Sequence, residues 1–159
     1  MYRLGEMVVH PLHGAGQIAE IVVKNVDGAD KIYYVVNIAS GGMSVMIPED
    51  KLEEVGLRPV MERCEAERVF SAIPDMSVES LEPNWNKRYK ENMLRIKSGD
   101  PMEVACVVKC LMRRDSGKGL STGERRMLRY AKDIFISEMV LSLEETGPEI
   151  ENKLTLAVS

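Results

Sequence analysis

The segment Asn84-Trp85-Asn86-Lys87-Arg88-Tyr89-Lys90 holds the residues best suited to contact with a charged partner. The chain's only tryptophan stands among Lys87, Arg88 and Lys90, directly after Asn84, a residue type that favours helix N-caps. Helix N-termini and basic side chains suit phosphate oxygens, and a large aromatic side chain can wedge against a base step in a widened minor groove. The segment therefore makes nucleic acid a candidate partner.

The same residues also allow a purely structural interpretation. Trp85, Tyr89, Met93 and Ile96 are spaced i, i+4, i+8 and i+11, which places them on one stripe of a helix. Aromatic side chains on such a stripe are most often buried. The residues alone therefore favour a core position for Trp85 over contact with a base.

The rest of the chain shows no clear pattern of a metal site or a phosphate-binding loop. His10 and His13 are the only histidines and lack a nearby cysteine, so we expect them to shape a turn and predict no metal site. Gly14-Ala15-Gly16 lacks the G-x-G-x-x-G spacing of a phosphate loop, and we expect it to form a turn between strands. Cys106 and Cys110 share a helix face with apolar neighbours and are predicted to be buried core thiols.

No Ser-His-Asp, Cys-His or paired-carboxylate arrangement stands at a recognisable spacing. We therefore expect no enzyme activity, no cofactor and no small-molecule substrate.

Composition indicates a folded protein. The 159 residues are 45% hydrophobic and 29% charged, which fits one compact domain or two small ones. No apolar run approaches the ~20 residues that a membrane-spanning helix needs, and the first residues do not resemble a signal peptide. We expect a cytoplasmic protein without a membrane partner, whose three cysteines stay reduced.

The net charge of −4 conceals an uneven distribution of charge along the chain. Residues 83–132 contain 13 Lys and Arg residues against 5 Asp and Glu residues, a net charge of +8. A basic block in an acidic chain fits a phosphate-bearing partner, although a solvated basic helix face would produce the same pattern.

The apolar periodicity changes near Pro59 and predicts an α+β protein of two modules. Residues 1–58 carry short β-branched stretches, including 18–23, 32–38 and 43–47, separated by turn residues. This spacing predicts a small, curled antiparallel sheet or barrel with exposed edge strands. Residues 59–159 show helical periodicity and predict a compact all-helical module.

Capping residues set the expected helix boundaries. We predict helices over 60–73, from Asn84 to Ser98, and from Pro101 until the break at 116–119, with a loop over 77–83. Ser121 and Glu124 form a capping-box pattern that opens a long helix to about residue 145. Its half from Ile134 onward is apolar on most faces and should be the buried centre of the module. Gly147-Pro148 should end it, before a short terminal helix over 149–158.

These segments together resemble the CarD family, also called CdnL, of bacterial RNA polymerase-binding regulators. Nearly the whole chain matches in order and spacing; the matching pieces are residues 8–16, 43–48, 84–90 with 98–100, and 120–128. The N-terminal part also resembles the polymerase-interacting domain of the transcription-repair coupling factor. The resemblance implies a Tudor-like N-terminal module that docks on the polymerase β subunit. It also implies a helical C-terminal module that contacts promoter DNA and stabilises the open complex.

The resemblance also implies roles for individual residues. Trp85 would be a minor-groove wedge, contrary to the preference for the core stated above, and DNA-backbone contacts would come from Lys87, Arg88, Lys90 and Arg125. The β-subunit contacts would come from Lys24, Val26 and Met46. Family members often carry a basic residue at the position of Met46, and a thioether cannot make that charge-assisted contact. The departure predicts a weaker or differently built polymerase contact.

Two alternatives to the regulator hypothesis stay open. In a protein-interaction adaptor the basic block would bind an acidic protein and Trp85 would be structural. Lys90→Glu would then leave promoter complexes unaffected. An enzyme would instead need a concave pocket with convergent titratable groups.

Overall fold

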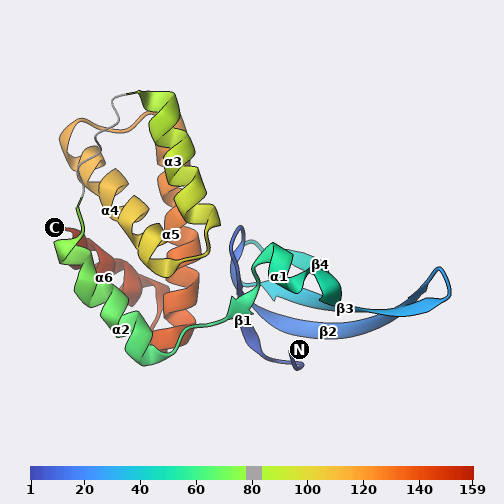
Figure 1. Ribbon diagram of the computed structural model, residues 1–159. Coiled ribbons are helices and arrows are strands. Elements are labelled where there is room, and N and C mark those ends of the chain that lie inside the picture. Colours follow the sequence, from blue (N-terminus) through green and yellow to red (C-terminus); the bar gives the residue numbers. More distant parts are fainter. Residues whose placement is uncertain (78–83) are drawn as a thin grey trace.

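The N-terminal part of the chain folds into a five-stranded antiparallel sheet in the order β4-β3-β2-β1-β5 (Figure 1). The structure is a computed structural model that describes residues 1–77 and 84–159. The strands are β1 (Met7–His10), β2 (Gly14–Val26), β3 (Ala29–Ile38), β4 (Ser44–Pro48) and β5 (Arg58–Pro59). The short helices η1 (Glu49–Lys51) and α1 (Leu52–Val55) link β4 to β5. The predicted Tudor-like antiparallel module is confirmed.

The hairpin β2–β3 is the longest part of the sheet and extends away from the helices (Figure 1). Its turn, Asp27-Gly28, has positive φ at both residues (53° and 81°), as two-residue hairpins of the twisted sheet require. Near the helices, alternate residues of β3 (Tyr34, Val36 and Ile38) are buried in the sheet's own core. The distal part of the hairpin has no such core, so Val23 is 60% exposed.

The prediction of a turn at Gly14-Ala15-Gly16 is wrong. The turn lies at residues 11–13, and Gly14 begins β2. The glycines serve close packing instead. A Cβ at Gly16 would lie 2.5 Å from the carbonyl oxygen of Asn37 on β3, so a larger residue would push the two strands apart.

Helices follow the sheet, which confirms the predicted α+β class with an all-helical second part. They are α2 (Arg63–Ala72), η2 (Ile73–Asp75), α3 (Trp85–Lys97), α4 (Pro101–Gly117), α5 (Thr122–Leu143) and α6 (Gly147–Val158). The side chains of the predicted caps Asn84, Asp100 and Ser121 each accept a hydrogen bond from a backbone N–H of the first turn. Of the predicted loop over 77–83, Ser77 is not helical and residues 78–83 lie outside the described residues.

One predicted helix end is confirmed and another differs from the structure. The break expected at 116–119 is present, because α4 ends at Gly117 and Lys118 is its C-cap. Gly147-Pro148, expected to end the long helix, stands in the first turn of α6, where proline is tolerated because its missing N–H needs no partner. Thr146 and Glu149 form a reciprocal capping box there. The long helix ends instead at Leu143, followed by Glu144 in the left-handed conformation (φ 54°).

Helix α5 is the centre of the helical core, as its apolar second half predicts (Figure 1). Phe135, Met139 and Leu143 are buried against the other helices. The helical module also contains a buried lysine, Lys109 on α4. Its Nζ donates to the carbonyl oxygens of Ile73, Pro74 and Met76 at 2.7–2.9 Å. Lys109 thereby holds η2 and the residue after it against α4.

The two modules meet where the β1–β2 turn contacts α5. The hydroxyl of Tyr130 donates to the carbonyl of Leu12 (2.6 Å), and the N–H of Ala15 donates to Ser137 Oγ (3.0 Å). Gly14 has φ +87°, and a Cβ there would lie 2.7 Å from Ser137 Oγ. Only glycine therefore fits both the backbone conformation and the close approach at this position.

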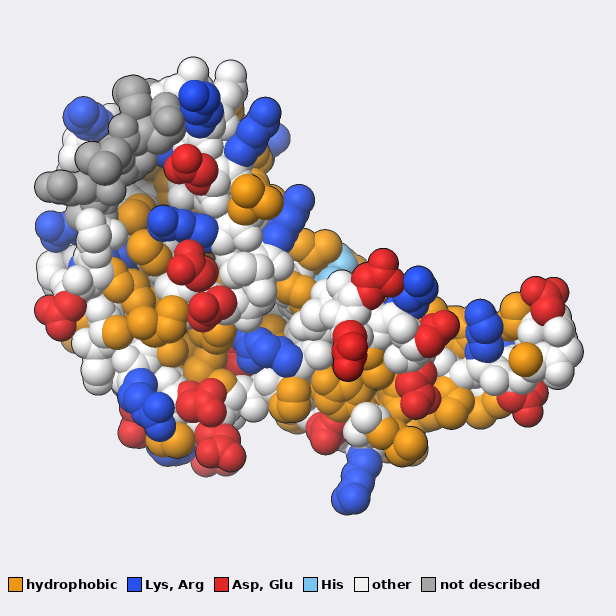
Figure 2. All heavy atoms as spheres, in the orientation of Figure 1, with side chains coloured by type: hydrophobic (Ala, Val, Ile, Leu, Met, Phe, Trp, Pro, Cys, Tyr) orange, Lys and Arg blue, Asp and Glu red, His pale blue; other side chains and the backbone are white. Residues whose placement is uncertain are grey.

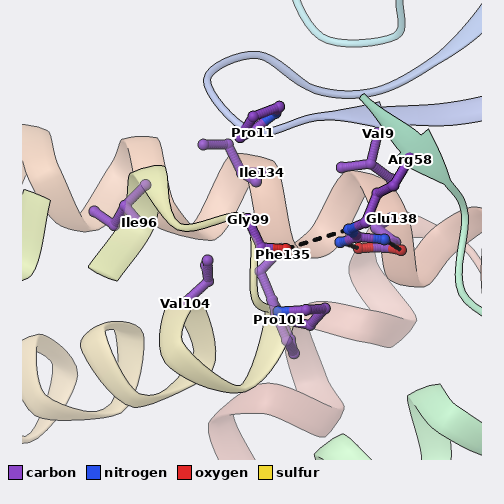
Figure 3. Close-up of a pocket in the computed structure, with 10 residues that line it drawn as sticks. All are labelled: Val9, Pro11, Arg58, Ile96, Gly99, Pro101, Val104, Ile134, Phe135 and Glu138. Atoms are coloured by element: carbon purple, nitrogen blue, oxygen red, sulfur yellow. Dashed lines mark hydrogen bonds and ion pairs between the residues drawn. The ribbon is translucent and has the colours of Figure 1, made fainter. Parts of the chain in front are cut away.

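An ion pair closes the junction on its other side. Arg58, on β5, donates from both terminal nitrogens to the Glu138 carboxylate of α5, at 2.7 and 2.6 Å, and its Nε donates to the Gly99 carbonyl. Figure 3 shows these side chains around a cavity of about 10 Å³, room for roughly one water molecule. Strand β5 straddles the predicted boundary between residues 58 and 59, which stays a prediction.

Candidate DNA and polymerase interfaces

The first turn of α3 presents the tryptophan at the surface. Asn84 Oδ1 accepts from the N–H of Lys87 and so starts the helix, and Trp85 lies 42% exposed. Its ring stacks on Tyr89 at 5.4 Å between centroids, with 25° between the planes. A Cβ at Gly123, at the start of α5, would lie 3.4 Å from the indole. Trp85 thus rests on two helices and keeps part of its ring exposed.

The interpretation of the Trp85 stripe as core holds for only part of the stripe. Ile96 is fully buried, and Tyr89 and Met93 are partly buried against the helical core. Trp85 lies beyond the end of that core. The helical spacing identified the stripe, but it could not indicate where along the helix the covering helices end.

The predicted DNA-contacting basic residues do not share one environment. Lys87, Lys90 and Arg125 are exposed, the first two on α3 and the third in the first turn of α5. Since Gly123 contacts Trp85, the starts of the two helices lie side by side. In the view of Figure 2, Lys and Arg side chains follow the edge of the helical module along α3.

Arg88 differs, because its side chain is only 13% exposed and lies 4.0 Å from the buried carboxylate of Glu124. Arg114 approaches the same carboxylate from α4 at 3.7 Å. Glu124 was expected only as a capping residue, because its spacing from Ser121 indicates a cap and nothing about α3 or α4. Two arginines therefore converge on a buried acid that sequence reasoning missed. Arg113 turns away and donates to the carbonyl of Val158.

The predicted polymerase-contacting residues share one face of the sheet. Lys24 is paired with Lys31 across the hairpin, Val26 with Ala29, and Met46 with Val35. Their partners on β3 are Lys31, Ala29 and Val35, which are separated by even numbers of residues and so lie on one face of that strand. Paired residues share a face, so Lys24, Val26 and Met46 also lie on one face of the sheet. This face is opposite to the one that buries Tyr34 and Ile47.

This outer face combines apolar and cationic side chains. Lys24 Nζ lies 5.7 Å from the centroid of the Tyr33 ring, and Met46 is 47% exposed. Met46 stands on β4, an edge strand of the sheet, so backbone groups beside it face outward. The face is suited to contact with another protein.

The two histidines stabilise the β1–β2 turn. His10 Nδ1 accepts from the N–H of Leu12 (3.0 Å), and the His10 and His13 rings lie 4.5 Å apart. Burial, reinforced by His13, lowers the pKa of His10 to about 4. Over residues 1–77 and 84–159, no group of three or more His, Cys, Asp or Glu side chains is placed to hold a metal ion.

The prediction that Cys106 and Cys110 are buried core thiols is wrong. Both are half-buried, neither belongs to the helical core, and both line a cleft between α3 and α4. The neighbouring positions Val107 and Val108 are the fully buried ones. The cysteines lie at the margin of the apolar stripe, where they line the cleft instead of entering the helical core.

Comparisons with known proteins identify both parts of the chain. A family model described as the CarD-like/TRCF RID domain matches residues 2–61, and one described as the CarD C-terminal domain matches residues 68–155. YdeB of Bacillus subtilis (strain 168), by name a candidate transcription factor, is 35% identical over 152 residues, covering 96% of this chain and 99% of YdeB.

Among solved structures, two come from Myxococcus xanthus. One is the solution structure of the 72-residue N-terminal domain of CarD, with 30% identity, a TM-score of 0.32, and 37% of this chain and 79% of that chain covered. The other is the CdnL N-terminal domain, with 34% identity, a TM-score of 0.33, and coverage of 38% and 86%.

None of the described helices is long and apolar enough to cross a membrane. The family comprises transcription regulators related to RNA polymerase interaction and is not a known enzyme family. The matches span both modules, and by them this chain belongs to the CarD family.

Proposed function

We propose that this protein stabilises the open promoter complex by holding RNA polymerase and upstream-fork DNA at the same time. Its β module binds the polymerase β subunit and its helical module binds DNA, in the cytoplasm, where transcription occurs. The observation that carries the proposal is the half-exposed Trp85 at the start of α3, flanked by the exposed Lys87, Lys90 and Arg125. Family membership supports the polymerase contact.

The β module acts as a tether. Residues 1–58 contact the β subunit through the face that carries Lys24, Val26 and Met46, and residues 59–159 contact DNA. Once anchored, the helical module is present at a high effective concentration, so weak phosphate contacts suffice. Isolated DNA binding should be feeble and steeply salt-dependent, because such contacts release counterions. The apolar Met46 favours a packed contact over a charge-assisted one.

The helical module acts as a wedge. Only an interaction stronger in the open than in the closed complex can shift the equilibrium between them. A partly exposed indole held against Tyr89 and Gly123 is rigid enough to pack against an unstacked base step at the fork. A difference of ~1.4 kcal/mol would change the ratio of open to closed complexes about tenfold.

The basic residues divide by environment into two roles. Lys87, Lys90 and Arg125 contact the DNA backbone directly. Arg88, whose side chain lies beside the buried Glu124, touches phosphate with its exposed part while it holds the starts of α3 and α5 together. Arg88→Lys should therefore weaken both folding and DNA contact, whereas Lys87→Gln should weaken DNA contact alone.

The test is the lifetime of the open complex on one promoter with the cognate polymerase. We compare the complex without the protein and with the wild-type, Trp85→Ala or Leu94→Ala chain. Leu94 is 70% exposed on the same helix and serves as a matched control. The wild-type and Leu94→Ala proteins should lengthen the lifetime, and Trp85→Ala, folded by circular dichroism, should not. A folded Trp85→Ala protein that acts like wild type would refute the wedge.

Lys90→Glu separates this proposal from an adaptor that binds only protein. The exposed Lys90 touches phosphate in our proposal, so its charge reversal should shorten the lifetime of the open complex. An adaptor would tolerate the change. If the wild-type protein has no effect on the lifetime, the adaptor hypothesis becomes the better one.

A further inference from the structure

The cleft between α3 and α4 holds two thiols and an excess of cations. Its volume is about 950 Å³, and Cys106 and Cys110 both line it, one helical turn apart on α4. Five Arg or Lys and three Glu are among its described lining residues. The nearest cation is Arg95 of α3, whose Nη1 donates to Cys106 Sγ at 3.4 Å.

The two thiols differ in their surroundings. A hydrogen bond from Cys110 and the charge of Arg95 lower the pKa of Cys106 to about 6, although burial and Glu103 act against the shift. The same hydrogen bond, with burial, raises the pKa of Cys110. The lowered pKa favours the thiolate form of Cys106 near neutral pH, while the raised pKa keeps Cys110 a thiol, whose Sγ lies 3.8 Å from the carbonyl oxygen of Ser77. The thiolate is the nucleophilic form of cysteine.

We propose that Cys106 is a site of reversible oxidation, at which a hydroperoxide and then an acidic low-molecular-weight thiol react. In the first step the Cys106 thiolate attacks the outer peroxide oxygen, the O–O bond breaks, and an S–O bond forms. The sulfur becomes a sulfenic acid, and the peroxide is reduced to an alcohol, or to water if it is hydrogen peroxide. In the second step the small thiol attacks the sulfenic sulfur, giving a mixed disulfide and water.

The helix geometry disfavours Cys110 as the thiol of the second step. Side chains four residues apart on a helix have Cβ atoms ~5–6 Å apart, whereas a disulfide needs ~3.8 Å. The internal disulfide would require α4 to unwind locally, and Val107 and Val108 in that turn are fully buried in the core. An external thiol needs no such change, because both cysteines are only half-buried and line the cleft formed by the described residues.

The charge of the cleft selects an acidic thiol. Two of its cations are paired with acids, Arg95 with Glu103 and Arg114 with Glu124, but the described lining still carries five cations against three carboxylates, and a carboxylate-bearing thiol such as glutathione complements this net positive charge. The third cysteine, Cys64 on α2, is exposed and is not among the residues that line this cleft. It is the natural internal comparison. The inference concerns this cleft alone and stands whether or not the helical module binds DNA.

The test treats the reduced full-length protein with hydrogen peroxide and glutathione and maps adducts by peptide mass spectrometry. Wild type and Cys64→Ser should carry the adduct on Cys106, and a reductant should remove it. The Cys106→Ser protein should carry much less adduct. Preferential modification of Cys64, or a Cys106–Cys110 disulfide in place of the adduct, would overturn the proposal.

A second measurement tests the role of the cleft charge. Cysteamine, a cationic thiol, should trap the oxidised Cys106 several times more slowly than glutathione. The midpoint of the pH profile for Cys106 alkylation should rise in Arg95→Gln and return toward wild type in Arg95→Lys. Equal trapping by the two thiols, or an unchanged midpoint in folded Arg95→Gln, would show that the cleft does not tune this thiol.

Discussion

Removing Arg58 should loosen the junction between the modules. Glu138 accepts three hydrogen bonds, two from Arg58 and one from the N–H of Met61 at 2.9 Å. Its side chain is only 5% exposed, so in Arg58→Ala the carboxylate stays buried and loses two of its three donors. Breaking a buried pair costs about 3–5 kcal/mol. Because the Arg58 side chain is 29% exposed and water can partly replace it, we expect about 3 kcal/mol.

The assay is urea unfolding followed by circular dichroism and by fluorescence of Trp85, the only tryptophan. Trp85 lies in the helical module, so its fluorescence reports the unfolding of that module, whereas circular dichroism reports both modules. The two transitions should therefore differ if the modules unfold independently. Arg58→Lys, which retains the charge but loses the paired donors, should show a smaller loss than Arg58→Ala. Lys51→Ala, which breaks an exposed pair with Glu54, should leave the midpoint unchanged.

A double-mutant cycle decides whether the two residues act as a pair. Arg58→Ala and Glu138→Ala should each lower the free energy of unfolding. The double mutant should lose much less than the sum of the two single losses, because it leaves no buried charge unpaired. A coupling energy below about 0.5 kcal/mol would show that Arg58 and Glu138 contribute independently, because losses that simply add are those of independent sites.

Two further stability predictions follow from buried polar groups. Lys109→Met should cost about 3 kcal/mol or more in urea unfolding, because three carbonyl oxygens lose their donor; a loss below about 1 kcal/mol would mean that water replaces the ammonium. His10 has a folded pKa of about 4, below its unfolded value near 6.5, so the stability it contributes is complete above pH ~6.5 and is lost as the pH falls toward 4. That loss, about 2 kcal/mol with allowance for screening, should disappear in His10→Asn and persist in His13→Asn, as thermal melts between pH 4 and 7 can show.

Features encoded in local stretches of sequence were predictable. The caps at Asn84, Asp100 and Ser121 lie where their residue types indicate, because a cap depends on a few neighbouring backbone groups. The change of periodicity near Pro59 separated sheet from helices for a similar reason. The family resemblance drew on several short segments in order, and the comparisons bear it out.

Features that depend on approach between distant segments were not predictable. Gly14 contacts Ser137 of α5, 123 residues further along the chain, and Gly16 contacts Asn37 of β3, 21 residues further along. Nothing in the local sequence indicates these partners, so the sequence alone predicts a turn at the two glycines. Arg58 and Glu138 are 80 residues apart in the chain, and no local pattern around either residue indicates that they pair.

Composition, caps and periodicity thus determined the class of this protein and its two-part order, and the resemblance of several short segments indicated its family. Tertiary packing decided which side of each helix remains open. It left Trp85 half exposed, turned Arg88 toward the buried Glu124, and opened the cleft at Cys106. The physical reason is that helical spacing specifies the direction of a side chain from its own helix axis. What that side chain meets is specified by neighbouring helices, whose positions result from the packing of the whole core.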